Sequence, residues 1–206
     1  MSTAYEEIGR VDQKRRTRAA LLDAARALIA RGESPTVEEA AAEAHVSRTT
    51  AYRYFPSQRD LLVAAYPQID AQSLVPDELA DEGPAARFEA VVDTIIEHVV
   101  RDEPQLRTML RLALEGREED RDKLVLRQGR AITWLEDALA PLRSTVRARE
   151  RRRLVLATRA AIGIEAFVWL TDVARLSPAE AAEVMRWSAR SLYTATVGDE
   201  EARPRA

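Results

Sequence analysis

The amino-acid sequence predicts an all-α protein. Ala, Leu, Arg and Glu dominate the chain, and these residues favour helices. Runs of β-branched residues are absent and only seven glycines occur in 206 residues. Apolar residues recur at the three- and four-residue spacing of amphipathic helices. A hydrophobic content of 46% beside 32% charged residues is that of an ordinary globular protein with a core.

Several classes of protein are disfavoured by composition. The chain has no cysteine, which removes disulfides, thiolate nucleophiles and Cys-based metal sites. The most apolar stretch, Ala160 to Leu170, is too short for a membrane span and contains Glu165. The N-terminus lacks a charged-then-apolar signal pattern. We therefore expect a cytoplasmic protein without a membrane span, a cofactor or a metal.

The charge distribution favours contact with phosphates at one end of the chain. Residues 10–60 carry ten Lys or Arg against seven Asp or Glu, a balance of +3. Residues 61–206 carry 21 against 25, a balance of −4. A basic N-terminal segment on an acidic body suits local binding to a nucleic-acid backbone.

The first helix is predicted over residues 12–31, with residues 1–9 frayed. Gly32 is placed to end this helix as a C-terminal cap. One stripe of the helix is apolar and predicts its buried face: Leu21, Leu22, Ala25, Leu28 and Ile29.

Two short helices follow, each with an N-cap. Thr36 and Glu39 fit a capping box for a helix that runs through Ala44. Ser47 caps a third helix over residues 48–55, which Pro56 ends. Ser57 caps the next helix.

After a linker at residues 70–84, five longer helices are predicted over residues 85–101, 104–115, 118–140, 146–174 and 178–197. We divide the chain into a domain at residues 10–56 and a second domain at residues 57–200.

The segment from Thr36 to Phe55 predicts a helix-turn-helix. Two short helices that cross steeply need small residues at their contact, and Ala40 and Ala44 provide these, with Val37 and Val46 as larger plugs. Ala51 faces back from the third helix, and Phe55 closes the core. The turn needs a residue that tolerates positive φ, which is usually glycine. His45 stands there, and histidine is among the non-glycine residues enriched in that conformation.

The outward face of the third helix carries groups suited to a DNA groove. An arginine can bond guanine bidentately and a threonine methyl fits thymine. Hydroxyl groups suit phosphates. The face consists of Ser47, Arg48, Thr49, Tyr52, Arg53 and Tyr54. Lys14, with Arg15, Arg16 and Arg18, is placed to follow the flanking DNA backbone or minor groove.

The stretch from about Arg18 to Leu62 resembles the DNA-binding domain of the TetR/AcrR family of repressors. The matching segments are Leu21 to Ala25, Thr36 to Ala41, Val46 to Ser57, and Leu61-Leu62. His45 departs from the glycine that the family often has in the turn, and Arg59 replaces a frequent lysine.

The resemblance implies a regulator that binds double-stranded DNA, with bases read by Arg48 and Thr49. The implied phosphate contacts are Thr36, Ser47, Tyr52, Tyr54 and Arg59. The family's C-terminal helices form an effector-binding and dimerisation domain. We expect a homodimer through the last two helices, a palindromic operator, and a repressor that an unknown small-molecule effector releases.

An effector pocket among the middle helices has five candidate lining residues: His98, Met109, Trp134, Glu165 and Trp169. Each also has a structural interpretation, which we favour. The tryptophans fit plain core or interface positions, and His98 fits an ordinary hydrogen-bonded histidine. Glu165, in an apolar helix, needs a partner such as Arg111 or Arg159.

Two other functions remain open. One is a DNA-binding regulator without a small-molecule effector. The other is an all-α binding module or enzyme, in which the segment Thr36 to Phe55 only packs. Two histidines, no cysteine and no glycine-rich phosphate loop leave an enzyme few catalytic groups, so we expect the protein not to be an enzyme.

Overall fold

The structure is a computed structural model that describes residues 3–65, 72–115 and 129–201. In these residues the regular elements are helices, which confirms the all-α prediction. The chain forms two compact units. The first comprises residues 1–68 and 104–127, and the second comprises residues 69–103 and 128–206. Each is considered by itself.

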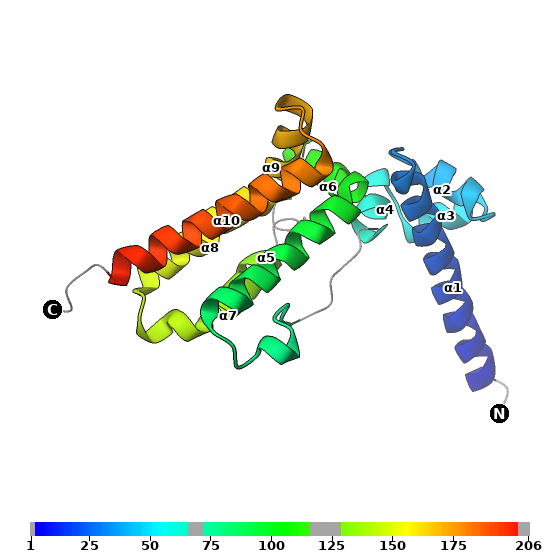
Figure 1. Cartoon of the computed structure of the whole chain (residues 1–206). Coiled ribbons are helices and arrows are strands. Elements are labelled where there is room, and N and C mark those ends of the chain that lie inside the picture. The colour runs from blue at the N-terminus through cyan, green and yellow to red at the C-terminus, as the bar shows by residue number, and fades with distance from the viewer. Residues whose placement is uncertain (1–2, 66–71, 116–128, 202–206) are drawn as a thin grey trace. The chain divides into compact units, whose positions relative to one another are not determined.

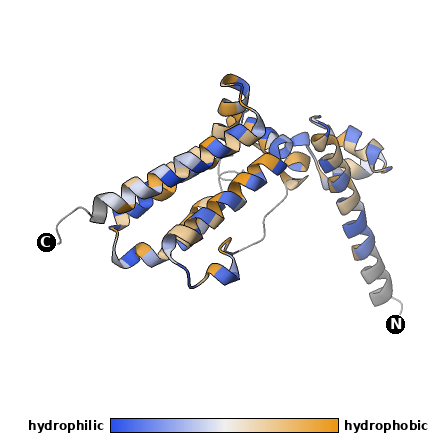
Figure 2. Cartoon of the chain, viewed as in Figure 1, coloured by the Kyte–Doolittle hydropathy of each residue, from blue (hydrophilic) through white to orange (hydrophobic). Residues whose placement is uncertain are grey.

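The first unit is a cluster of five helices around one apolar core (Figure 1). Its helices are α1 (Thr3–Ala30), α2 (Val37–Glu43), α3 (Arg48–Tyr54), α4 (Gln58–Ala65) and α6 (Glu103–Glu115). The predicted stripe of α1 lies in this core, where Leu21 and Ala25 are fully buried and Ile29 nearly so. Figure 2 shows hydrophilic turns in α1 ahead of this apolar half.

Helix α1 is longer than predicted. It begins at Thr3 rather than near Asp12, so the prediction of a frayed start was wrong for residues 3–9. The helix formers Ala4, Glu6 and Glu7 favour this extension. The predicted glycine cap is confirmed. Gly32 has φ +83°, and its N–H donates to the carbonyl of Ile29 at 2.8 Å, as in a Schellman motif.

Helices α4 and α6 pack with the DNA-binding motif rather than apart from it. Leu61 and Leu62 of α4 are fully buried in the first core, and Met109 and Leu112 of α6 join them. The predicted boundary at residue 57 therefore does not coincide with the compact units. Sequence periodicity finds the apolar face of each helix but not the core in which that face is buried.

The second unit contains the remaining helices, with the longest ones packed side by side (Figure 1). Helix α10 (Pro178–Glu201) packs against α8 (Ala148–Ile162) and α5 (Pro84–Arg101), and α7 (Arg130–Ala138) packs against α5 and α8. The shorter elements are η1 (Asp77–Leu79), η4 (Ala140–Ser144), α9 (Ile164–Val168) and the π-helical η5 (Trp169–Val173).

Two predicted helices differ from the structure. The helix predicted over residues 146–174 is broken at Gly163, whose extended backbone (φ −85°, ψ 172°) ends α8 and caps α9. The helix predicted over residues 118–140 is described only from Arg130, because residues 116–128 lie outside the described part. Its end at Ala138 comes before Pro141, which starts the tighter turn η4.

The stretch Ala148–Val173 is apolar and long enough, by length and composition alone, to cross a membrane. This differs from the prediction that no segment could do so. Of its most apolar window, 39% is buried inside the protein. Core helices pass the same test, and Leu154, Ile162 and Phe167 of this stretch are core residues.

Candidate nucleic-acid interface

The turn between α2 and α3 is a Schellman motif with a histidine in the left-handed position. His45 has φ 52°. The N–H of Val46 donates to the carbonyl of Ala41 at 2.8 Å, and the N–H of His45 donates to that of Ala42 at 3.1 Å. The predicted positive φ at His45 is confirmed. The motif reverses the chain in two residues and so directs α3 across α2.

The predicted N-caps of α2 and α3 are both present. Thr36 Oγ1 accepts from the N–H of Glu39 at 3.2 Å, and Glu39 Oε2 accepts from the N–H of Thr36 at 2.7 Å. The Glu39 carboxylate accepts from the N–H of Thr36 and also from its hydroxyl, and these two hydrogen bonds, the first more than the second, lower the pKa of Glu39. Ser47 Oγ accepts from the N–H of Thr50 at 3.2 Å. Each short helix therefore starts at a residue defined by the sequence.

Small residues lie in the core between the two helices, although the predicted contact residue Ala44 is only partly buried there. Ala40 of α2 and Ala51 of α3 are both fully buried, and Phe55 closes the core at 3% exposed. The guanidinium of Arg18 lies over the ring of Phe55, 5.5 Å from its centroid. With Ala51 facing inward, the opposite face of α3 points to solvent.

That exposed face carries most of the predicted DNA contacts. Ser47, Arg48, Thr49, Tyr52 and Arg53 are all exposed. Tyr54 differs, because it is only half exposed and packs against the core of the first unit. The structure thus brings five of the six predicted residues of this helix onto one accessible surface.

A carboxylate that the sequence analysis missed lies on the same surface. Glu38, in the first turn of α2, accepts from the hydroxyl of Tyr52 at 2.7 Å and pairs with the guanidinium of Arg48 at 2.7 Å. The Arg48 guanidinium also lies 5.8 Å from the centroid of the Tyr52 ring. The hydrogen bond from the Tyr52 hydroxyl to the Glu38 carboxylate lowers the pKa of Glu38 and raises the pKa of Tyr52. No sequence signal pointed to Glu38, because its partners lie ten and fourteen residues away across a turn.

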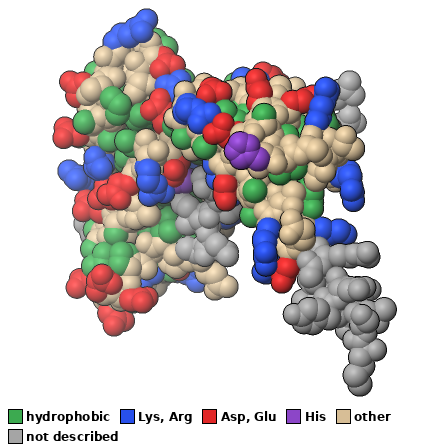
Figure 3. Space-filling model, turned by 90° about the vertical axis from the view of Figure 1, so that its right-hand side faces the viewer, with side chains coloured by type: hydrophobic (Ala, Val, Ile, Leu, Met, Phe, Trp, Pro, Cys, Tyr) green, Lys and Arg blue, Asp and Glu red, His purple; other side chains and the backbone are tan. Residues whose placement is uncertain are grey.

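Two further predicted contacts lie beside the motif. Arg59, in the first turn of α4, is half exposed, and its Nη2 atom is buried without a hydrogen-bond partner. Lys14 is exposed on α1, two helical turns before the first core residue, Leu21. On the face of the molecule in Figure 3, Lys and Arg side chains are interspersed with Asp and Glu. On the surface of the motif itself, Glu38 lies beside Arg48, so this surface also carries both charges.

Of the five candidate pocket residues, Met109 belongs to the first unit and the other four belong to the second unit. Met109 is buried in the core of the first unit, and Trp169 is 57% exposed, so neither has the predicted position. Helix α6 carries Met109 into the DNA-binding core, and Trp169 starts the π-helical turn at the surface.

The other three candidates have the structural roles that we favoured. Trp134 is buried in α7. His98 is largely buried near the end of α5, where its Nδ1 lies 2.7 Å from Asp102. Glu165 is paired with Arg159 at 3.1 Å, which confirms one of the two predicted partners.

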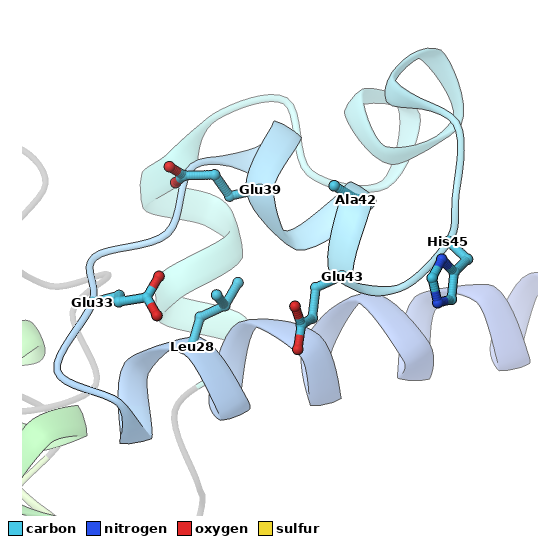
Figure 4. A pocket seen from close by; sticks show the side chains of 6 residues that line it. All are labelled: Leu28, Glu33, Glu39, Ala42, Glu43 and His45. Carbon is cyan, nitrogen blue, oxygen red and sulfur yellow. The ribbon is translucent and has the colours of Figure 1, made fainter.

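A cavity of about 500 Å³ lies between α1 and α2 (Figure 4). Three carboxylates line it, from Glu33, Glu39 and Glu43, with Leu28, Ala42 and His45. Glu39 is engaged in the capping box, and Arg31 pairs with Glu33 at 2.9 Å and with Glu43 at 3.3 Å. These carboxylates are therefore satisfied within the protein, and among the described residues no group of side chains could hold a metal ion.

The tight turn, the capped helices and the exposed face of α3 define a helix-turn-helix protein that binds DNA. Residues 21–65 match the family model for bacterial regulatory proteins of the tetR family. The match spans α4 and the motif, together with the buried half of α1. The N-terminal part of the chain thus carries a DNA-binding domain of the tetR type, which supports a DNA-binding transcription regulator. Comparison with curated proteins found no match.

Proposed function

We propose that α3 enters the major groove of a palindromic operator, where Arg48 and Thr49 contact base edges. The single observation that carries this proposal is the exposed face of α3 opposite the buried Ala51. Arginine at a helix start has the reach and the donor geometry to bond guanine O6 and N7 together. Threonine beside it offers a methyl group to thymine.

Phosphate contacts fall to the residues around this face. Ser47 and Arg53 flank the reading residues, and Thr36 and Tyr54 lie at the edges of the motif. Tyr52, which was also expected at a phosphate, donates its single hydroxyl proton to Glu38 and instead supports Arg48 with its ring. Arg59 is half-buried in the first turn of α4, and the accessible part of its guanidinium can donate to a phosphate. Lys14 on α1 extends the contact along the flanking backbone.

The protein acts as a homodimer through its last two helices. Along α10 one stripe is buried within the chain, including Met185 at 0% and Ala189 at 1% exposed. A second stripe, with Trp187 at 67% and Val184 at 38%, is exposed. An exposed tryptophan on an apolar stripe supports a contact with a second copy of the chain. Two-fold symmetry would place two α3 helices about one DNA turn, or a multiple of it, apart.

The regulator is a cytoplasmic repressor that a small-molecule effector in the C-terminal unit releases from the operator. Release requires only that the effector bind more tightly to the DNA-free arrangement of the dimer. The support for this step is the family's division into a DNA-binding domain and a helical body.

The test is a selection of bound duplexes from a random-sequence pool, followed by binding measurements on the selected duplex. Arg48→Ala and Tyr52→Ala are expected to lose specific binding, by about 1–3 kcal/mol for the base contact of Arg48, while circular dichroism stays unchanged. Arg149→Ala removes an exposed arginine of the second unit and is the matched control. Normal binding by both α3 variants would show that the reading helix is wrongly assigned.

A further inference from the structure

We propose that Glu38 is a specificity-determining residue, which holds Arg48 and Tyr52 in one orientation and weakens binding to DNA that lacks the operator bases. The inference rests on the proposed function, because it requires α3 to be the reading helix. Glu38 acts through Arg48 and is therefore a positioning residue.

The geometry joins three side chains from two helices. A single oxygen, Oε1 of Glu38, lies 2.7 Å from both the Tyr52 hydroxyl and the Arg48 guanidinium. The Arg48 side chain is 72% exposed, so without this anchor its four rotatable bonds would leave it free to follow any nearby phosphate. The ring of Tyr52 lies beside the guanidinium and limits its remaining freedom.

This arrangement treats base edges and phosphates differently. A guanidinium has about five N–H donors, so Arg48 can keep its bond to Glu38 and still donate to a guanine in the groove. Non-specific binding, in contrast, depends on the number of phosphates that cations neutralise. Because its charge is already paired with Glu38, Arg48 adds little to the number of neutralised phosphates. The Glu38 carboxylate itself repels the DNA backbone.

The neighbouring carboxylates do not share this role. Glu39 bonds to Thr36 and caps α2. Glu43 pairs with Arg31, which follows α1. Among these three glutamates of α2, Glu38 is the one that bonds to side chains of α3. Its position is therefore explained by the DNA-facing surface rather than by the stability of α2.

The experiment measures the affinity of Glu38→Gln for two duplexes over a range of salt concentrations. One duplex is selected by the wild-type protein from a random pool, and the other has the same length and a scrambled sequence. We expect affinity for the scrambled duplex to rise about two- to fivefold, the worth of an exposed ion pair. The slope of log affinity against log salt should steepen by about 0.9, the value of one phosphate contact. The ratio of the two affinities should fall.

Glu43→Gln makes the same change of charge in the same helix and should leave the ratio unaltered. In an Arg48→Ala background, Glu38→Gln should not change the ratio further, because the guanidinium that Glu38 positions at the base edge is gone although Tyr52 remains. The inference is wrong if Glu38→Gln leaves the ratio of the two affinities and the salt slope at their wild-type values. It is also wrong if Glu43→Gln changes this ratio as much as Glu38→Gln does. If Arg48→Ala itself binds the selected duplex normally, the proposed function fails instead. Thermal unfolding of each variant checks that the fold is retained.

Discussion

Arg159 and Glu165 form an ion pair of 3.1 Å across the break between α8 and α9. The pair closes over Gly163, and a side chain at that position would overlap both charged groups. The break therefore has a glycine because the side chains of Arg159 and Glu165 occupy the space that a Cβ atom would need. The backbone of Gly163 is extended and open to any residue.

Gly163→Ala should displace the Arg159 side chain and break its ion pair with Glu165. The loss of this pair should lower the free energy of unfolding by about 1 kcal/mol or less. The loss is limited because the groups in the way are the ends of flexible side chains. Alanine also reduces the entropy of the unfolded chain, which stabilises by about 0.4–1 kcal/mol. In an Arg159→Ala, Glu165→Ala background, where the pair is absent, Gly163→Ala should become neutral or stabilising. Urea unfolding gives both values, and an equal loss in the two backgrounds would show that backbone packing, not the ion pair, demands glycine.

His45 stands in a left-handed conformation, so its replacement by a β-branched residue should destabilise the first unit. His45→Val is expected to cost at least about 1–2 kcal/mol, because left-handed backbone brings Cβ close to a carbonyl oxygen. His45→Gly relieves that contact and should be no less stable than the wild type. Thermal unfolding compares the two variants. If valine is tolerated as well as glycine, the turn does not constrain this position.

His98 should make the protein sensitive to mild acid. Burial lowers the pKa of His98 from its ordinary value of 6.5, while Asp102 raises it by a smaller amount. The neutral imidazole therefore stabilises the fold above pH 6.5. This contribution is lost as the pH falls below that value, through the lowered pKa of the folded state.

The measurement is the unfolding temperature at pH 7.5 and at pH 5.5. His98→Gln keeps a donor toward Asp102 and should reduce the difference between the two unfolding temperatures. The reduction should be about 2–4 °C for each 1 kcal/mol that the titration of His98 contributes to the free energy of unfolding. His45→Asn is the control. It removes the other histidine and keeps a residue that tolerates positive φ. An unchanged difference in His98→Gln would refute the role of His98.

Trp187→Glu should convert the proposed dimer into a monomer. The side chain is 67% exposed, on the face of α10 opposite Met185, so burial against a second copy would desolvate a new carboxylate. Sedimentation at micromolar concentration measures the change. Leu114→Glu, at a 76% exposed apolar position of α6, should remain dimeric. A monomeric wild-type protein would overturn the dimer proposal altogether.

Features that depend on near neighbours in the chain were predictable from sequence. The glycine cap at Gly32, the capping box of Thr36 and Glu39, and the positive φ of His45 all follow from residue types at fixed spacing. The buried stripe of α1 and the accessible face of α3 follow from helical periodicity. These local rules account for the DNA-binding motif.

Features that depend on partners distant in the chain required the tertiary structure. Met109 was predicted near an effector pocket but lies in the DNA-binding core, because only the packing of α6 assigns its apolar face to that unit. Trp169 was predicted in the same pocket and is exposed.

Glu38 was not singled out at all, although it contacts two predicted DNA-binding residues. The sequence by itself determined which residues α3 presents to solvent, since helical spacing and caps are short-range properties. The tertiary structure decided which charged neighbour restrains them, because that contact forms only when the turn at His45 folds α3 back across α2.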